Sequence, residues 1–118
     1  MSTTEHGAST AAQAQVPGID RTDLQHYDLN APGWQMIQNR VAINPQAQPI
    51  RHKHPGEEII YVLEGSLEYS IDGREPRTYT AGEALTVPAE TVHSVHGTGT
   101  ELATYVVEKG KPFILLAD

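Results

Sequence analysis

The pattern of apolar and polar positions predicts short β-strands along most of the chain. Residues 66–71 alternate between apolar and polar side chains, the period of a strand with one buried face. Residues 57–64 instead contain a continuous apolar run, Ile59 to Leu63, which is typical of a strand at the centre of a core. The one window that suggests a helical period is 20–27. We expect further strands at 34–43, 77–80, 84–87, 91–96, 102–108 and 113–116.

Glycine and proline separate these segments. Asp72-Gly73 is a strong hairpin signal, Pro88 ends a strand, and residues 97–99 are predicted to form a loop. Many short strands with such turns in 118 residues favour an all-β sandwich or barrel. We predict a single domain at residues 19–118, preceded by a disordered tail at residues 1–18 that lacks apolar periodicity.

The composition of the chain limits the classes of binding partner and chemistry to be expected. Lys and Arg total 8 against 15 Asp and Glu, so the formal net charge of -7 disfavours nucleic acid as a partner. No apolar run is long enough for a membrane span, and we expect no membrane partner. There are no cysteines for thiol catalysis. We expect a cytoplasmic location; a periplasmic or secreted one follows if Ala12-Gln13-Ala14 is the remnant of a signal peptide.

The candidate chemistry lies in a group of histidines. His52 and His54 are spaced to share one face of an extended strand, Glu58 follows a Pro-Gly turn, and His93 comes later. Three neutral imidazoles and one carboxylate form a mixed N/O site for one divalent transition metal: Fe, Mn, Ni, Cu, Co or Zn. The alternative is that these are ordinary core or surface histidines.

Two motifs resemble those of the cupins. The run His52-x-His54-x3-Glu58-x6-Gly65 resembles the first cupin motif, and Gly82-x5-Pro88-x4-His93 resembles the second. The resemblance implies a double-stranded β-helix jelly-roll barrel (the cupin fold) and the metal ligands His52, His54, Glu58 and His93.

Three positions depart from the family pattern. Gln46 and Glu90 stand where the motifs usually have glycine, and Gly97 stands where the second usually has asparagine. None of these is a metal ligand in the family pattern, so the departures concern turn geometry.

The resemblance to small single-domain cupins, including quercetinase-like dioxygenases, implies a metal-dependent oxidoreductase. Its substrate would be a small chelating or enol-type molecule, with Glu58 also serving as the catalytic base. The alternatives are a non-catalytic binding module for small molecules or metal, and a redox-neutral isomerase or lyase. We expect a homodimer formed by packing or exchange of edge strands.

Further side chains are candidates for the pocket. Gln38 and Arg40 share one face of their predicted strand, which is either inside the barrel or solvated. Tyr61, Tyr69 and Tyr105 either supply a phenol to the pocket or pack in the core. We expect Glu57 and His96 to point away from the site.

Overall fold

The computed structural model describes residues 16–117, so residues 1–15 of the tail predicted at residues 1–18 lie outside this range. Within the described residues the chain is all-β and has no helix that could cross a membrane. The strands are β1 (Ile19–Asp28), β2 (Trp34–Ile43), β3 (His52–Lys53), β4 (Glu57–Ile71), β5 (Arg77–Thr80), β6 (Ala84–Val87), β7 (His93–Glu108) and β8 (Leu115–Leu116).

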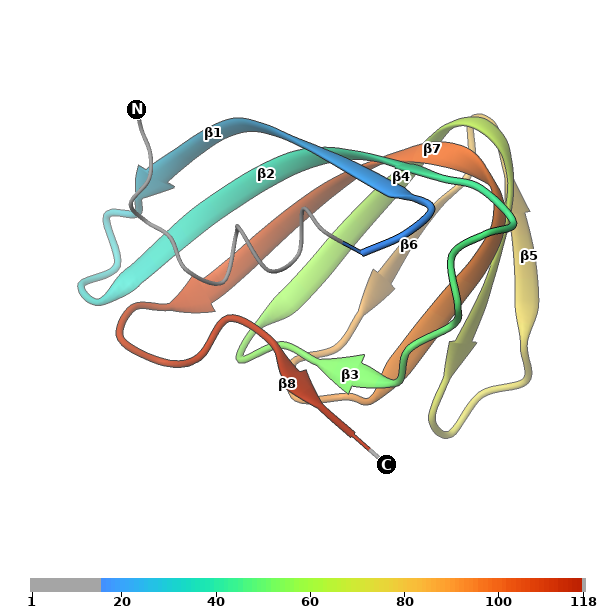
Figure 1. Ribbon diagram of the computed structural model, residues 1–118. Helices are drawn as coiled ribbons and strands as arrows, with labels where there is room; N and C mark the ends of the chain where they lie inside the picture. The colour runs from blue at the N-terminus through green and yellow to red at the C-terminus, as the bar shows by residue number, and fades with distance from the viewer. Residues whose placement is uncertain (1–15, 118) are drawn as a thin grey trace.

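Two long strands, β4 and β7, join two layers of antiparallel sheet (Figure 1). In one layer the first half of β4 pairs with β6, and the second half of β7 pairs with β2, which in turn pairs with β1. In the other layer the second half of β4 pairs with β5, and the start of β7 pairs with β3, which pairs with β8. This is the double-stranded β-helix jelly roll predicted from the sequence, and the fold prediction is confirmed.

Glycines allow β4 and β7 to bend between the layers. Gly65 has φ of 76° and lies opposite Gly99 in the β4–β7 register, beside a bulge between Val62 and Glu64. A Cβ atom on Gly65 would collide with the backbone of Thr98, so no larger residue fits there without a shift. The bend thus depends on close backbone approach.

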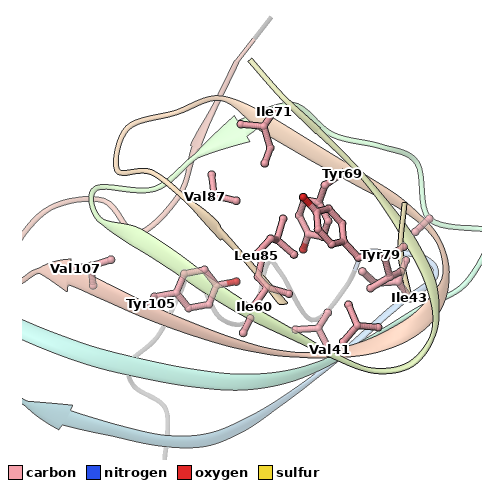
Figure 2. Close-up of a cluster of buried hydrophobic side chains, with 14 residues drawn as sticks. Val41, Ile43, Ile60, Tyr69, Ile71, Tyr79, Leu85, Val87, Tyr105 and Val107 are labelled. Carbon is pink, nitrogen blue, oxygen red and sulfur yellow. The ribbon is translucent and has the colours of Figure 1, made fainter. Parts of the chain in front are cut away.

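The core lies between the two layers (Figure 2). Strand alternation sends Ile60 and Val62 of β4 inward, and both are fully buried. On β7 the same alternation buries Ala103, Tyr105 and Val107. The inner positions of β4 and β7 therefore supply much of the core and also, as shown below, several polar groups of the site.

The structure corrects three expectations. Residues 20–27 belong to β1 and are not helical; most of this edge strand is exposed, so it lacks a simple apolar alternation. Gly65 bends β4 but does not end it, and the residues 97–99 expected as a loop lie inside β7. By contrast, the bounds predicted for β2, β5 and β6 are confirmed.

Candidate metal centre

Strand pairing brings the three histidines together. His52 of β3 lies directly opposite His93 of β7, although the two residues are far apart in sequence. His54 follows β3, and one ring nitrogen from each of the three histidines lies within 4.8 Å of the others. His54 and His93 are buried, at 3% and 1% exposure. The sequence spacing therefore corresponds to one compact cluster.

Backbone carbonyls fix the orientation of all three rings. The Nδ1 atoms of His52, His54 and His93 lie 2.7, 2.9 and 2.9 Å from the carbonyl oxygens of Ile50, Phe113 and Thr91 respectively. A carbonyl accepts only from an N–H, so each Nδ1 carries a proton and each Nε2 is left for another partner. Such a contact to the distal nitrogen is typical of metal-binding histidines.

Glu58 adds a buried carboxylate to the cluster. Its Oε1 lies 3.0 Å from Nε2 of His93 and 3.4 Å from Nε2 of His54. Burial alone would raise the pKa of Glu58, but the two imidazoles outweigh burial and hold this pKa well below its usual range. Glu58 is therefore ionised at neutral pH.

The pKa values of His52 and His93 are shifted in opposite directions. Burial, together with the nearby His93 and His54, lowers the pKa of His52 to about 4. Burial also opposes charge on His93, yet its hydrogen bond to Glu58 raises the pKa of this imidazole overall. His52 is thus already in the neutral form that a metal ligand requires.

The donor set fits a divalent transition metal. Nε2 of His54 is buried and, within residues 16–117, makes no hydrogen bond of good geometry, since Oε1 of Glu58 lies 3.4 Å away. This arrangement leaves a costly unsatisfied polar atom unless something binds there. Three imidazole nitrogens and one carboxylate oxygen suit Mn, Fe, Co, Ni, Cu and Zn alike. His52, His54, His93 and Glu58 are the residues that would hold the ion.

One departure from the motif leaves a strained residue beside the cluster. Glu90 occupies the position at which the second motif usually has glycine, and its φ is 60°, in the left-handed region that glycine favours. Its backbone N–H donates to the carbonyl of His54 at 2.9 Å, and its carboxylate pairs with Lys53 at 3.4 Å. The turn therefore keeps a conformation suited to glycine, held by contacts to the histidine-bearing segment.

The other candidate residues separate into two groups. Tyr105 and Tyr69 are buried next to the cluster, with ring centroids 4.8 Å from His54 and 6.4 Å from His93 respectively. Figure 2 shows both tyrosines projecting into the same interior. By contrast, Tyr61 is 46% exposed on the outer face of β4.

Gln38 and Arg40 also lie on the outer side of their strand. The neighbouring positions Asn39 and Val41 are the buried ones. Gln38 bonds to Gln25 and Thr104, and Arg40 is exposed. The structure does not bring this pair to the histidines. Glu57 and His96 are exposed, as predicted, and His96 pairs with Glu68 at 3.5 Å.

The sequence analysis missed two charged residues inside the barrel. Glu101 of β7 is 3% exposed and accepts a 2.6 Å hydrogen bond from the hydroxyl of Tyr69. Burial and the charge of Glu58 raise the pKa of Glu101 to about 8. Arg21 of β1 contacts the Tyr105 hydroxyl at 3.4 Å. A signal for Glu101 was present, since it shares the inner face with Ala103, Tyr105 and Val107.

Comparison with known proteins defines the class. A family profile described as the cupin domain matches residues 39–108, which is more than half of the chain. The chain belongs to the cupin family. A search of curated proteins finds no significant match.

Solved structures give the same answer for the fold. KdgF from Halomonas sp. is 23% identical over 80% of this chain and 83% of its own, with a TM-score of 0.63. The polyketide cyclase RemF from Streptomyces resistomycificus is 21% identical over 87% and 75%, with a TM-score of 0.64. Oxalate oxidase in complex with the substrate analogue glycolate is 24% identical over 99% and 63%, with a TM-score of 0.64. At these identities the likeness concerns the fold, which hosts different chemistries.

Proposed function

We propose that this cupin is a metal-dependent oxidoreductase that uses O2 to oxidise a small chelating or enol-type molecule. The observation that carries the proposal is the orientation of the three imidazoles: each Nδ1 faces a backbone carbonyl, and the three side chains converge beside Glu58. A closed structural site has no room for a further ligand, whereas four protein ligands leave a position open on an ion that prefers five or six. When bound, the metal would supply Lewis-acid or redox chemistry at that position.

The chain's own residues would set the conditions for this chemistry. Ionised Glu58 offsets part of the positive charge. The resemblance to cupins also makes its carboxylate the candidate base for a proton of a substrate hydroxyl. The buried ring of Tyr105 and the partly buried ring of Phe113 pack around His54, with centroids 4.8 and 5.0 Å from its ring. These rings limit water access and lower the local dielectric, which strengthens each polar contact.

Oxygen uptake tests the proposal. Protein loaded separately with Fe, Mn, Cu, Ni, Co and Zn is mixed with a panel of enols, flavonols and diketones in an oxygen electrode. We expect O2 consumption with at least one redox-active metal, and its loss in His54→Ala but not in His96→Ala, which changes an exposed histidine. We also expect azide or catechol to shift the metal's absorption spectrum.

Other outcomes select the alternatives. Turnover of a substrate without O2 consumption would favour a redox-neutral isomerase or lyase. Ligand binding with no turnover by any metal form would favour a binding module.

We also propose a homodimer. The edge strands β1 and β8 expose Tyr27 and Leu116, at 66% and 74%, and the outer face of β4 exposes Ile59 and Tyr61, at 45% and 46%. Exposed apolar groups of this kind mark contact surfaces, and two-fold dimers are the commonest oligomers. Sedimentation should give the mass of two chains at micromolar concentration; Leu116→Lys and Tyr61→Lys then show whether the edge or the outer face is needed. The mass of one chain for the unaltered protein would reject the dimer.

A further inference from the structure

Arg21 places a guanidinium inside the barrel without a carboxylate partner. Ile19, on the same face of β1, packs against the core, which shows that this face points inward. Nε of Arg21 is fully buried and has no hydrogen-bond partner among the residues that the structure describes. Within residues 16–117 no Asp or Glu oxygen lies within 4.0 Å of the guanidinium. A buried cation with an unsatisfied N–H is costly, so its presence calls for an explanation.

Within residues 16–117, only one corner of the guanidinium is engaged. Nη1 contacts the Tyr105 hydroxyl at 3.4 Å. With the Asn39 amide turned so that its oxygen faces Arg21, this oxygen accepts from the same Nη1 at 3.1 Å, and the amide nitrogen donates to Asp23 at 3.0 Å. The edge formed by Nε and Nη2 is left over. Two parallel N–H groups on such an edge match the two oxygens of a carboxylate.

The barrel's own carboxylates are occupied elsewhere. Glu101 accepts the hydroxyl of Tyr69 at 2.6 Å, and Glu58 faces the imidazoles of His93 and His54. Burial opposes a charge on Arg21, but the nearby Tyr105, Glu58 and Glu101 raise its pKa, so the guanidinium stays charged. The interior therefore holds a cation whose Nε edge makes no direct contact with a carboxylate of residues 16–117.

Tyr105 links this cation to the metal centre. Its hydroxyl contacts Arg21, while its ring lies 4.8 Å from the ring of His54. In the described part of the chain, the hydroxyl makes no hydrogen bond other than that with Arg21, so its own proton has no acceptor. Arg21 and Tyr105 thus offer donors within reach of a molecule that also contacts the histidine cluster.

We propose that the Nε edge of Arg21 binds the carboxylate of a small anionic ligand, with support from the Tyr105 hydroxyl. The inference rests on the proposed function and names its substrate class: a small carboxylic acid whose enol, keto or hydroxyl group reaches the cluster of His52, His54 and His93. Arg21 then decides specificity, because a site built for an anion rejects the neutral analogue.

Paired ligands test this directly. Calorimetry compares glycolate, pyruvate and malate with their neutral amides, on metal-free and on zinc-loaded protein. We expect at least one carboxylate to bind and its amide to bind at least tenfold more weakly. Arg21→Met should weaken the carboxylate roughly 10- to 100-fold, the usual range for hydrogen bonds to a charged group, and leave the amide unchanged. Arg74→Met, at an exposed turn position, serves as the matched control and should change neither.

A second variant covers the case in which Arg21→Met does not fold. Arg21→Lys keeps the charge but loses the planar fork, so it should fold and still reduce the preference for carboxylate over amide. Equal binding of carboxylate and amide by the unaltered protein would overturn the inference. So would failure of every carboxylate to bind, or a preference that survives in the folded Arg21 variants.

Carboxylate binding to metal-free protein and O2 consumption by metal-loaded protein test the anion site and the proposed function separately. If carboxylate binding to metal-free protein depends on Arg21 while no metal form consumes O2, the anion site stands and the oxidase fails. If O2 is consumed but Arg21→Lys and Arg21→Met bind carboxylates as the unaltered protein does, the anion site alone fails.

Discussion

Glu58 and Glu101 are buried in the same interior to nearly the same extent, at 4% and 3% exposure, yet their surroundings push their pKa values in opposite directions. Glu58 faces two imidazoles, which lower its pKa well below the usual range. Glu101 faces a neutral phenol and the charge of Glu58, and burial raises its pKa to about 8. Since two nearby buried carboxylates resist ionising together, one holds the charge and the other the proton.

The comparison shows that burial alone does not mark a functional carboxylate. The surroundings decide: the imidazoles beside Glu58 keep this carboxyl ionised. Glu101 instead keeps its proton because of burial and the nearby charge of Glu58, although the hydrogen bond from Tyr69 favours its ionised form. Both arise from the inner positions of the two central strands, Glu58 on β4 and Glu101 on β7.

The largest effect is expected from removing the charge of Glu58. Glu58→Gln should lower metal affinity by more than about 100-fold, since even residues that only support a ligand are worth 10- to 100-fold. Turnover should fall further than binding, because we propose that the carboxylate also serves as the base. Competition with a chromophoric chelator measures the affinity, and Glu57→Gln, at the exposed neighbouring position, is the control. An unchanged affinity in Glu58→Gln would remove Glu58 from the ligand set.

A smaller, pH-dependent effect is expected at Glu101. In the unfolded chain this carboxyl ionises with the ordinary glutamate pKa of 4.5, whereas in the folded protein its pKa is about 8, so the folded state binds more protons between these values. The stability that protonated Glu101 provides is fully present below pH 4.5 and is lost as pH rises through 8. Urea unfolding of metal-free protein should therefore show that Glu101→Gln gains stability relative to the unaltered protein as pH rises from about 5 to about 8.

Several other charged groups face Glu101 or lie near it and affect the stability of both proteins. The informative quantity is therefore the difference in unfolding free energy between Glu101→Gln and the unaltered protein at each pH. Arg21, Glu58, Tyr69 and Tyr105 are common to both proteins, and His52 has a pKa of about 4, below this window. The same pH dependence in both proteins would refute the assignment of the raised pKa to Glu101.

The smallest of these effects is expected at Tyr69. Tyr69→Phe removes the 2.6 Å hydrogen bond to Glu101 and should reduce the free energy of unfolding by about 1–3 kcal/mol at pH 6. Tyr79→Phe changes a neighbouring buried tyrosine, whose ring centroid is 6.3 Å from that of Tyr69, and should cost less. Equal losses of unfolding free energy in Tyr69→Phe and Tyr79→Phe would mean that the hydrogen bond to Glu101 does not add to stability.

The sequence predicted the fold and the histidine cluster for physical reasons. Alternation and turn residues delimit β2, β5 and β6, and metal chemistry requires particular residue types at short spacings, as at His52 and His54. Strand β1 could not be predicted in this way, because it is a largely exposed edge strand whose inward side chain at residue 21 is charged. The glycine-rich middle of β7 has the composition of a loop, although its pairing with Gly65 needs glycine for close approach.

Arg21 and Glu101 could not be paired with their partners from sequence. Arg21 contacts a residue 84 positions away, and Glu101 bonds to one 32 positions away, so no local spacing signals either contact. Gln38 and Arg40 share a face of β2, as predicted, but alternation alone does not say which face is inside.

Metal content tests the central claim most directly. Elemental analysis of protein purified without chelator, or reconstituted and desalted, should find close to one divalent transition metal per chain. His54→Ala should lose most of this metal, and His96→Ala should keep it. A protein that takes up no metal after reconstitution, or a folded His52→Ala/His54→Ala variant that keeps a full complement, would contradict the assignment of the centre.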